Sequence, residues 1–169
     1  MKIIETGVFR SSDFYSTETS PLRTVARYEL EYYDGGEGFS VVDGVKYPHA
    51  GRHFLLARPG DKRFSIGRFE CRYAHFTSDD EPEVGEIARC LTEPDDDSVQ
   101  EMKELRNLRG LRQLASLCAL LDRLRAGGMP ERQSEPTERY LDAVMKTKEY
   151  MERNYGSKIT LDDLAGMVY

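Results

Sequence analysis

The stretch Tyr47-Pro48-His49-Ala50-Gly51-Arg52-His53-Phe54-Leu55-Leu56-Ala57-Arg58-Pro59-Gly60-Asp61-Lys62-Arg63-Phe64-Ser65-Ile66 carries the strongest indication of the fold. Its apolar run, residues 54–57, has high β propensity, and Pro59-Gly60 forces a turn because proline fixes φ and glycine frees it. After it, Phe69, Cys71 and Tyr73 alternate with charged residues, as in a strand with one dry and one wet face. These strands are predicted to form walls of one small barrel or sandwich.

Further strands are predicted before this stretch. Tyr28-Glu29-Leu30-Glu31-Tyr32 alternates large apolar residues with glutamates, which indicates a strand whose glutamates face water. The glycine-rich run 34–38 predicts a turn, and Asp43-Gly44 between two β-prone runs predicts a type I′ hairpin. Short strands without a helical pattern before about residue 80 favour an antiparallel barrel or a double-sheet jelly roll. Residues 6–20, rich in Ser and Thr, are expected to be an extended arm without a stable element.

Composition bounds the class of protein. The chain has 169 residues and a net charge of −6, which argues against a general polyanion binder. No run approaches the roughly 18 apolar residues that span a bilayer, and the N-terminal apolar block is too short for a signal peptide, so a cytoplasmic protein without a membrane partner is expected. Three widely spaced cysteines predict reduced thiols. Residues 79–97 hold nine acids and one base, Arg89.

Two leucine-rich helices are predicted over residues 99–124, divided at Gly110 and ended by Gly127-Gly128. Their leucines wrap around the helix, so more than one side must be covered. Four of them keep a three-four-three spacing, as in a short helical seam: Leu114, Leu117, Leu121 and Leu124. We expect this seam to pair two copies of the chain. The alternative is a helix that packs only into the core of its own chain.

The C-terminal part begins with a polar linker, residues 129–137. A helix should follow, with one apolar face formed by Leu141, Val144, Met145, Met151 and Tyr155, and it should end at Gly156. Thr160 is placed to cap a second helix, whose first turn contains Asp162 and Asp163. Leu161, Leu164, Ala165 and Val168 give that helix its apolar face.

The order of strand, glycine-rich turn, hairpin, Ala50-Gly51, apolar strand, Arg58-Pro59-Gly60 turn and a strand ending in His75-Phe76 resembles the cupin-type sensor domain of AraC-family transcription regulators. Residues 150–165 resemble the start of that family's DNA-binding domain. The resemblance implies an α+β fold: a cupin-like antiparallel β-barrel or jelly roll over residues 1–97 with an arm at 1–20, a helical dimerisation segment at 98–128, the linker, and a truncated helix-turn-helix start at 138–169. One departure is Arg63, which stands where the family has a histidine.

This resemblance implies a small-molecule effector in the barrel, a homodimer through the helical segment, and DNA contact only through the remainder of the C-terminal domain, because the recognition helix is absent before Tyr169. The period-two pattern places Tyr28, Tyr32, Cys71 and Tyr73 on the inner wall, and Cys71 and Tyr73 match positions that line the pocket of sugar-sensing members. An arginine before the first strand, Arg23 or Arg27, also matches a ligand contact. With Arg63, these arginines predict a small polar or anionic effector.

Catalysis has little support in the sequence. Metal-dependent cupins use clustered histidines with a carboxylate, whereas His49, His53 and His75 lack the H-x-H spacing. No phosphate-binding or nucleophile motif is present either. We therefore predict no catalytic residue, metal or cofactor. The two alternatives are a small cupin enzyme and a dimerisation module without a ligand.

Overall fold

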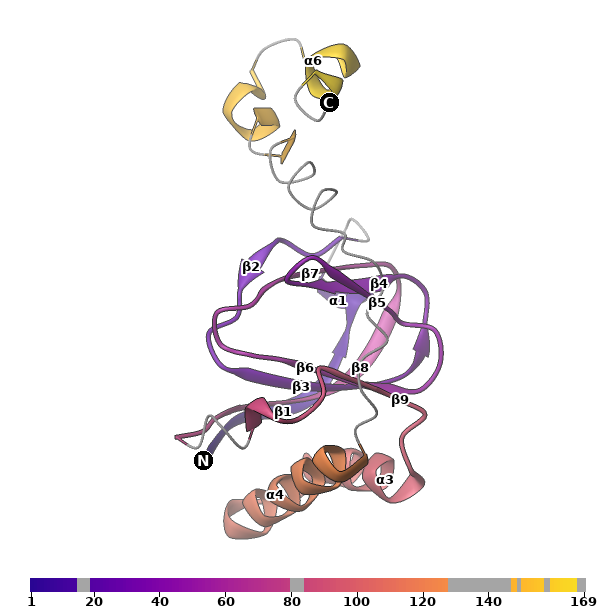
Figure 1. Ribbon diagram of the computed structural model, residues 1–169, viewed down its shortest axis with the longest axis vertical. Coiled ribbons are helices and arrows are strands. Elements are labelled where there is room, and N and C mark those ends of the chain that lie inside the picture. The colour runs from indigo at the N-terminus through magenta and orange to yellow at the C-terminus, as the bar shows by residue number, and fades with distance from the viewer. Residues whose placement is uncertain (15–18, 80–83, 128–146, 149, 157–158, 167–169) are drawn as a thin grey trace.

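The computed structural model describes residues 1–14, 19–79, 84–127, 147–148, 150–156 and 159–166 (Figure 1). The strands are β1 (Lys2–Arg10), β2 (Arg23–Thr24), β3 (Tyr28–Gly36), β4 (Phe39–Val42), β5 (Val45–Pro48), β6 (His53–Ala57), β7 (Lys62–Ile66), β8 (Phe69–Thr77) and β9 (Cys90–Thr92). The helices are α1 (Ser11–Phe14), α3 (Asp96–Leu105), α4 (Gly110–Gly127) and α6 (Leu161–Ala165).

The strands form two sheets that face each other, and α3 and α4 lie beneath the larger sheet (Figure 1). The larger sheet has the order β1-β8-β3-β6-β9 and the smaller has the order β2-β7-β4-β5. Every strand pair is antiparallel. The predicted α+β class with antiparallel sheets is therefore confirmed, whereas the described strands form two separate sheets and not a closed barrel.

The predicted turns occur where their residues require them. In the β4–β5 hairpin, Asp43 and Gly44 both have positive φ, at 48° and 81°, as a two-residue loop of the type I′ class needs. A second turn separates β7 from β8, which lie in different sheets. A Cβ on Gly67 in this turn would lie 2.2 Å from the carbonyl oxygen of Glu37, so only glycine lets the two turns meet.

The N-terminal segment differs from the expected arm, because residues 2–10 form β1, an edge strand of the larger sheet. It pairs with β8 from Lys2 opposite Thr77 to Arg10 opposite Glu70. Gly7 makes room for the ring of Tyr73, whose hydroxyl lies 2.7 Å from where a Cβ of residue 7 would be. Most of β1 is partly exposed, so its apolar alternation is too weak to identify it as a strand.

The larger sheet is buried on both faces. Tyr28, Leu30 and Tyr32 of β3 pack toward α3 and α4, in one cluster with Leu105 and Leu117. The other face of β3 points into the space between the sheets. Glu29 and Glu31 are therefore buried, and the prediction that these glutamates face water is wrong. A covered sheet has no wet face, so the polar half of an alternating strand is buried as well.

The leucines of the expected dimer seam contribute mainly to the core of the chain itself. Gly110 does divide the two helices, as predicted. However, Leu117, Leu121 and Leu124 are buried against the larger sheet and only Leu114 is partly exposed. A seam made by these leucines is thus corrected to an intramolecular helix packing, because side chains that already fill a core are not accessible to a partner.

The acid-rich segment and the C-terminal part add two observations. Arg89, the single base of residues 79–97, contacts Asp61 in the β6–β7 turn and so ties the segment to the sheets.

Thr160 caps α6 through a capping box with Asp163, as predicted. Leu161 is exposed. The linker at 129–137, Leu141, Val144, Met145 and Val168 lie outside the described residues, and the helix-turn-helix stays a prediction. No described helix is long and apolar enough to cross a membrane.

The packing of α4 predicts a contrast between two of its leucines. Leu117→Ala should lower the free energy of unfolding by about 2–5 kcal/mol, because Leu117 is fully buried. Leu111→Ala should change it by less than about 0.5 kcal/mol, since Leu111 is 85% exposed. Urea denaturation at two protein concentrations measures both. A loss in Leu117→Ala that depends on protein concentration would restore the dimer seam.

Candidate functional site

A pocket of about 300 Å³ opens between the two sheets. Its wall combines charged, hydroxyl and aromatic side chains: Glu5, Phe9, Ser20, Arg23, Glu31, Arg63, Ser65, Phe69, Tyr73 and His75. These residues come from β1, β2, β3, β7 and β8 and from the segment before β2. Both sheets therefore contribute to one site, which has the size of a small-metabolite site and the mixed chemistry that fixes a polar ligand.

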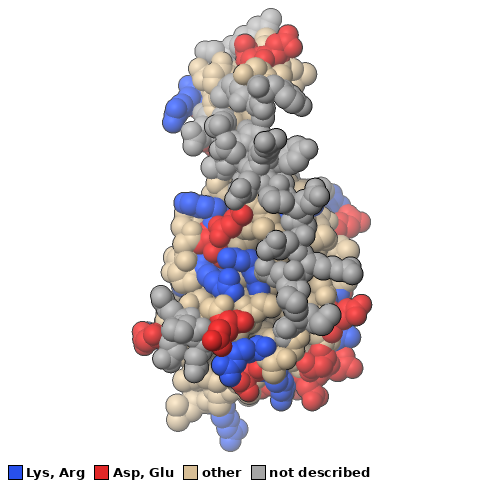
Figure 2. Space-filling view, in the orientation of Figure 1, with Lys and Arg blue, Asp and Glu red and all other residues tan. Residues whose placement is uncertain are grey.

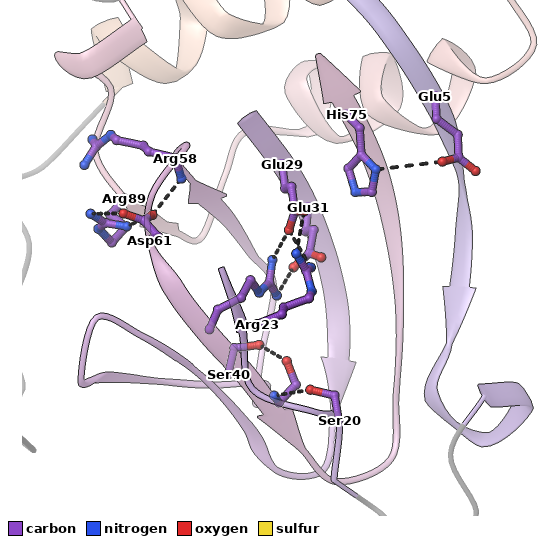
Figure 3. A network of polar contacts seen from close by, with 12 residues as sticks. Glu5, Ser20, Arg23, Glu29, Glu31, Ser40, Arg58, Asp61, His75 and Arg89 are labelled. Atoms are coloured by element: carbon purple, nitrogen blue, oxygen red, sulfur yellow. Dashed lines mark hydrogen bonds and ion pairs between the residues drawn. The ribbon is translucent and has the colours of Figure 1, made fainter. Parts of the chain in front are cut away.

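Two arginines and two glutamates form a compact ionic cluster, and all of them except Glu29 line this pocket (Figure 3). Arg63 donates to Glu29 Oε2 at 3.0 Å and to Glu31 Oε2 at 2.8 Å. Arg23 makes a bidentate pair with Glu29, with both distances 2.7 Å. The planar fork of arginine suits such paired carboxylates. We call these four residues the ionic cluster.

The ionic cluster satisfies its own charges. Arg63 is only 4% exposed, and two charges of each sign compensate one another. Burial alone would raise the pKa of Glu31, but the charge and hydrogen bond of Arg63, with a hydrogen bond from Tyr33, lower that pKa below its ordinary value. Burial acts against the charged form of Arg63 too, yet Glu31 and Glu29 raise its pKa well above the usual value. Both groups are therefore ionised in the fold.

A chain of hydroxyl groups continues from the cluster into the smaller sheet. The Tyr33 hydroxyl donates to Glu31 Oε2 at 2.6 Å. Ser40 lies within hydrogen-bond distance of His49 Nε2, at 3.0 Å, and of Ser65 Oγ, at 2.8 Å. The Ser65 amide in turn donates to Ser20 Oγ at 2.7 Å (Figure 3). Polar contacts thus cross the whole space between the sheets and fix the pocket floor.

Two histidines stack on the ring of this tyrosine. The ring centroids of His49 and His53 lie 4.7 and 4.6 Å from that of Tyr33, and both imidazoles are buried. Burial lowers the pKa of His49 to about 4, so the ring is neutral at physiological pH. Among the described residues, no three His, Cys, Asp or Glu side chains are placed to hold a metal ion. Both histidines are buried and packed against the Tyr33 ring.

The pocket brings together some of the predicted ligand residues and separates others. Arg23, Arg63 and Tyr73 line it, and Cys71 is buried between the sheets beside it. Arg27 is not part of its wall. The prediction that Tyr28 and Tyr32 lie on the inner wall is wrong, because both face α3 and α4.

The sheet register explains this separation and identifies residues that were missed. Glu31 lies opposite Tyr73 and Glu29 lies opposite His75, and residues opposite one another share a face. The face that includes Tyr73 therefore includes the glutamates and excludes Tyr28 and Tyr32. Glu5, Glu31, His75 and the two pocket phenylalanines, Phe9 and Phe69, were not predicted from sequence. The sequence did contain one indication of the roles of Glu29 and Glu31. Arginines on other strands, Arg23 and Arg63, can pair with glutamates that are buried between the sheets.

Basic and acidic side chains lie next to one another on the face of the molecule that Figure 2 shows. Neither a protein-family model nor a curated protein matches this chain.

Removal of the Arg63 guanidinium should destabilise the fold, because the buried glutamates lose a charged partner. Arg63→Met should lower the free energy of unfolding by about 3–5 kcal/mol, because it leaves two buried carboxylates without their common partner. Arg125→Met removes an exposed arginine that pairs with Asp122, and it should cost less than about 1 kcal/mol. Chemical denaturation at neutral pH measures both values. Equal losses in the two variants would contradict the assigned role of the cluster.

Acid should weaken the fold before the carboxylates titrate. The folded-state pKa of His49 is about 4 and the ordinary value is 6.5, so the unfolded chain binds more protons between these values. The free energy of unfolding should fall by up to about 3 kcal/mol as the pH drops from 6.5 to 4. His53 and His75, whose pKa values are also lowered by burial, add to this slope.

The variant His49→Gln separates these contributions. Glutamine does not titrate, so the pH slope should decrease by up to one proton while the slope from the other histidines remains. Urea titrations across this pH range measure the slope. An unchanged slope would show that His49 is protonated in the fold.

Proposed function

We propose that the chain is the effector-sensing region of a transcription regulator of the AraC type, with the pocket between its sheets as the effector site. The observation that carries the proposal is the pocket itself, which joins charged, hydroxyl and aromatic groups on a floor held by the ionic cluster. Two antiparallel sheets followed by two helices, and the Thr160-capped helix near the C-terminus, also agree with the expected order of a cupin-type sensor and a helix-turn-helix start.

The charge balance of the site favours an uncharged polar effector. Arg23 and Arg63 are both engaged by Glu29, and Arg63 also by Glu31, while Glu5 adds a further negative charge at the pocket wall. An anion would have to compete with these carboxylates for the arginines. A neutral polyhydroxylated molecule instead finds donors and acceptors side by side, and the two pocket phenylalanines offer rings to its apolar face. We therefore narrow the expected effector class to neutral polyols and sugars.

The same sheet provides a route from effector to helices. β3 and β8 line the pocket on one face and pack against the helices on the other. β1 contributes Glu5 and Phe9 to the wall, and Ser20 follows from the segment after it. In this proposal, binding of the effector displaces these strands and thereby shifts the population of helix arrangements. That population shift is the regulatory signal. The proposed homodimer uses the exposed side of α4 that faces away from the larger sheet.

A matched pair of tyrosine variants tests the site. Thermal unfolding of the full chain with a panel of monosaccharides and linear polyols should identify a ligand that raises the melting temperature. For that ligand, Tyr73→Phe should weaken binding by roughly two- to tenfold, the value of one hydrogen bond, because Tyr73 lines the pocket. The Tyr73 hydroxyl donates to Glu5 at 2.8 Å, and Tyr32→Phe removes a comparable hydroxyl, which donates to Asp34 at 2.7 Å but belongs to a residue of the helix-facing side. It should leave the affinity unchanged.

Two results would contradict the proposal. The first is a panel in which no compound stabilises the chain. The second is a ligand whose affinity falls in Tyr32→Phe and not in Tyr73→Phe, which would place the effector outside the pocket.

A further inference from the structure

A second hollow, of about 430 Å³, lies between the end of β1 and the connection from α3 to α4. β1 provides Thr6, Gly7, Val8 and Arg10, and the connection provides Arg106, Asn107 and Arg109. We call it the arginine groove. Gln113 of α4 holds its two walls together, since its side-chain amide donates to Thr6 Oγ1 and to the Leu105 carbonyl, both at 3.1 Å. The groove is thus a fixed feature of the fold.

The arginine groove has an unusual charge for a chain whose net charge is −6. Three arginines line it and no acid does. Arg10 shares its charge with Glu70 at 2.6 Å, but neither Arg106 nor Arg109 forms an ion pair with a described residue. Arg109 instead donates to the carbonyl oxygens of Arg106 and Leu108, which holds its guanidinium at the groove. Two positive charges are therefore available to a negatively charged partner.

The other wall of the groove is the edge of a sheet. β1 pairs with β8 on one side, and no described strand pairs with it on the other. An edge strand presents unpaired N–H and C=O groups, which can form hydrogen bonds with an extended segment. Thr6, Val8 and Arg10 lie opposite Ala74, Arg72 and Glu70, on the sheet face that turns to the helices. Alternate side chains of an added strand would point to that same face, where Arg106 and Arg109 lie.

From these features we infer that β1 and the arginine groove form a docking site for an extended acidic peptide segment of another protein. The peptide adds as a further strand to the edge of β1. Its acidic residues, at every second position, pair with the three arginines of the groove, and its remaining side chains face the other side of the sheet. Main-chain hydrogen bonds supply the orientation, and the arginine–carboxylate pairs supply the preference for acidic sequence. The site is separate from the pocket between the sheets, so it does not rest on the effector.

Fluorescence anisotropy with the full chain tests the site. The probe is a short labelled peptide in which Glu and Val alternate, and it should bind with an affinity that falls as salt is raised. Replacing its Glu residues by Lys should abolish binding. Replacing a central Val by Pro removes one N–H and disturbs the extended strand, and should weaken binding at least about tenfold although the charge is unchanged.

Variants of the chain complete the test. The double variant Arg106→Glu/Arg109→Glu should weaken the Glu–Val peptide by about a hundredfold or more, because two attractive charges become repulsive. Arg123→Glu/Arg125→Glu changes the net charge equally on α4 outside the groove and should have little effect. Circular dichroism checks that both variants fold, which is expected because all four side chains are exposed.

Four results would overturn the docking site. They are no binding of the Glu–Val peptide, equal binding of the proline peptide, unchanged affinity in Arg106→Glu/Arg109→Glu, and tighter binding of a single-stranded oligonucleotide than of the peptide. Sedimentation of the chain alone provides a further criterion. A dimer that the Glu–Val peptide dissociates would assign the edge of β1 to a second copy of the chain.

Discussion

The pairing of Arg63 with Glu29 and Glu31 is the interaction on which this architecture depends. β3 lies in the middle of the larger sheet, and that sheet is covered by helices on one face and by the smaller sheet on the other. A carboxylate there loses its hydration, which costs several kcal/mol unless a partner compensates it. Arg63, from β7 of the opposite sheet, provides this partner and so joins the two layers by charge where an apolar contact would be expected.

This ionic contact also determines where a pocket can exist. Apolar side chains between two sheets interdigitate until the space is filled, as they do around Val25, Tyr33 and Leu55. The ionic cluster has a fixed hydrogen-bond geometry and cannot collapse in that manner. The pocket is found beside the cluster, where Arg23 lines the wall and remains partly exposed. The charged floor is therefore a reason both for the packing of the sheets and for the space left between them.

The sequence predicted the local structure well and the faces of the strands poorly. Asp43-Gly44, Pro59-Gly60, Gly110 and Thr160 act through backbone geometry or capping, which neighbouring residues determine, and all four have the predicted role. The direction in which β3 points depends on what covers it. Alternation distinguishes the two faces of a strand, but it does not say which face turns to the helices and which turns to the other sheet. The prediction for Tyr28 and Tyr32 is wrong for this reason.

The same reasoning explains which part of the candidate site was predictable. On β8 the apolar half of the pattern does face the space between the sheets, and Cys71 and Tyr73 were assigned correctly to that face. On β3 the apolar half faces the helices instead. β3 pairs with β8 such that Glu31 lies opposite Tyr73, so no single rule of apolar side inward is correct for both strands. Only the register, combined with the position of α3 and α4, resolves this conflict. Charge provided a usable signal, because two glutamates alternating within a short strand need arginines from another strand if both faces of the sheet are covered.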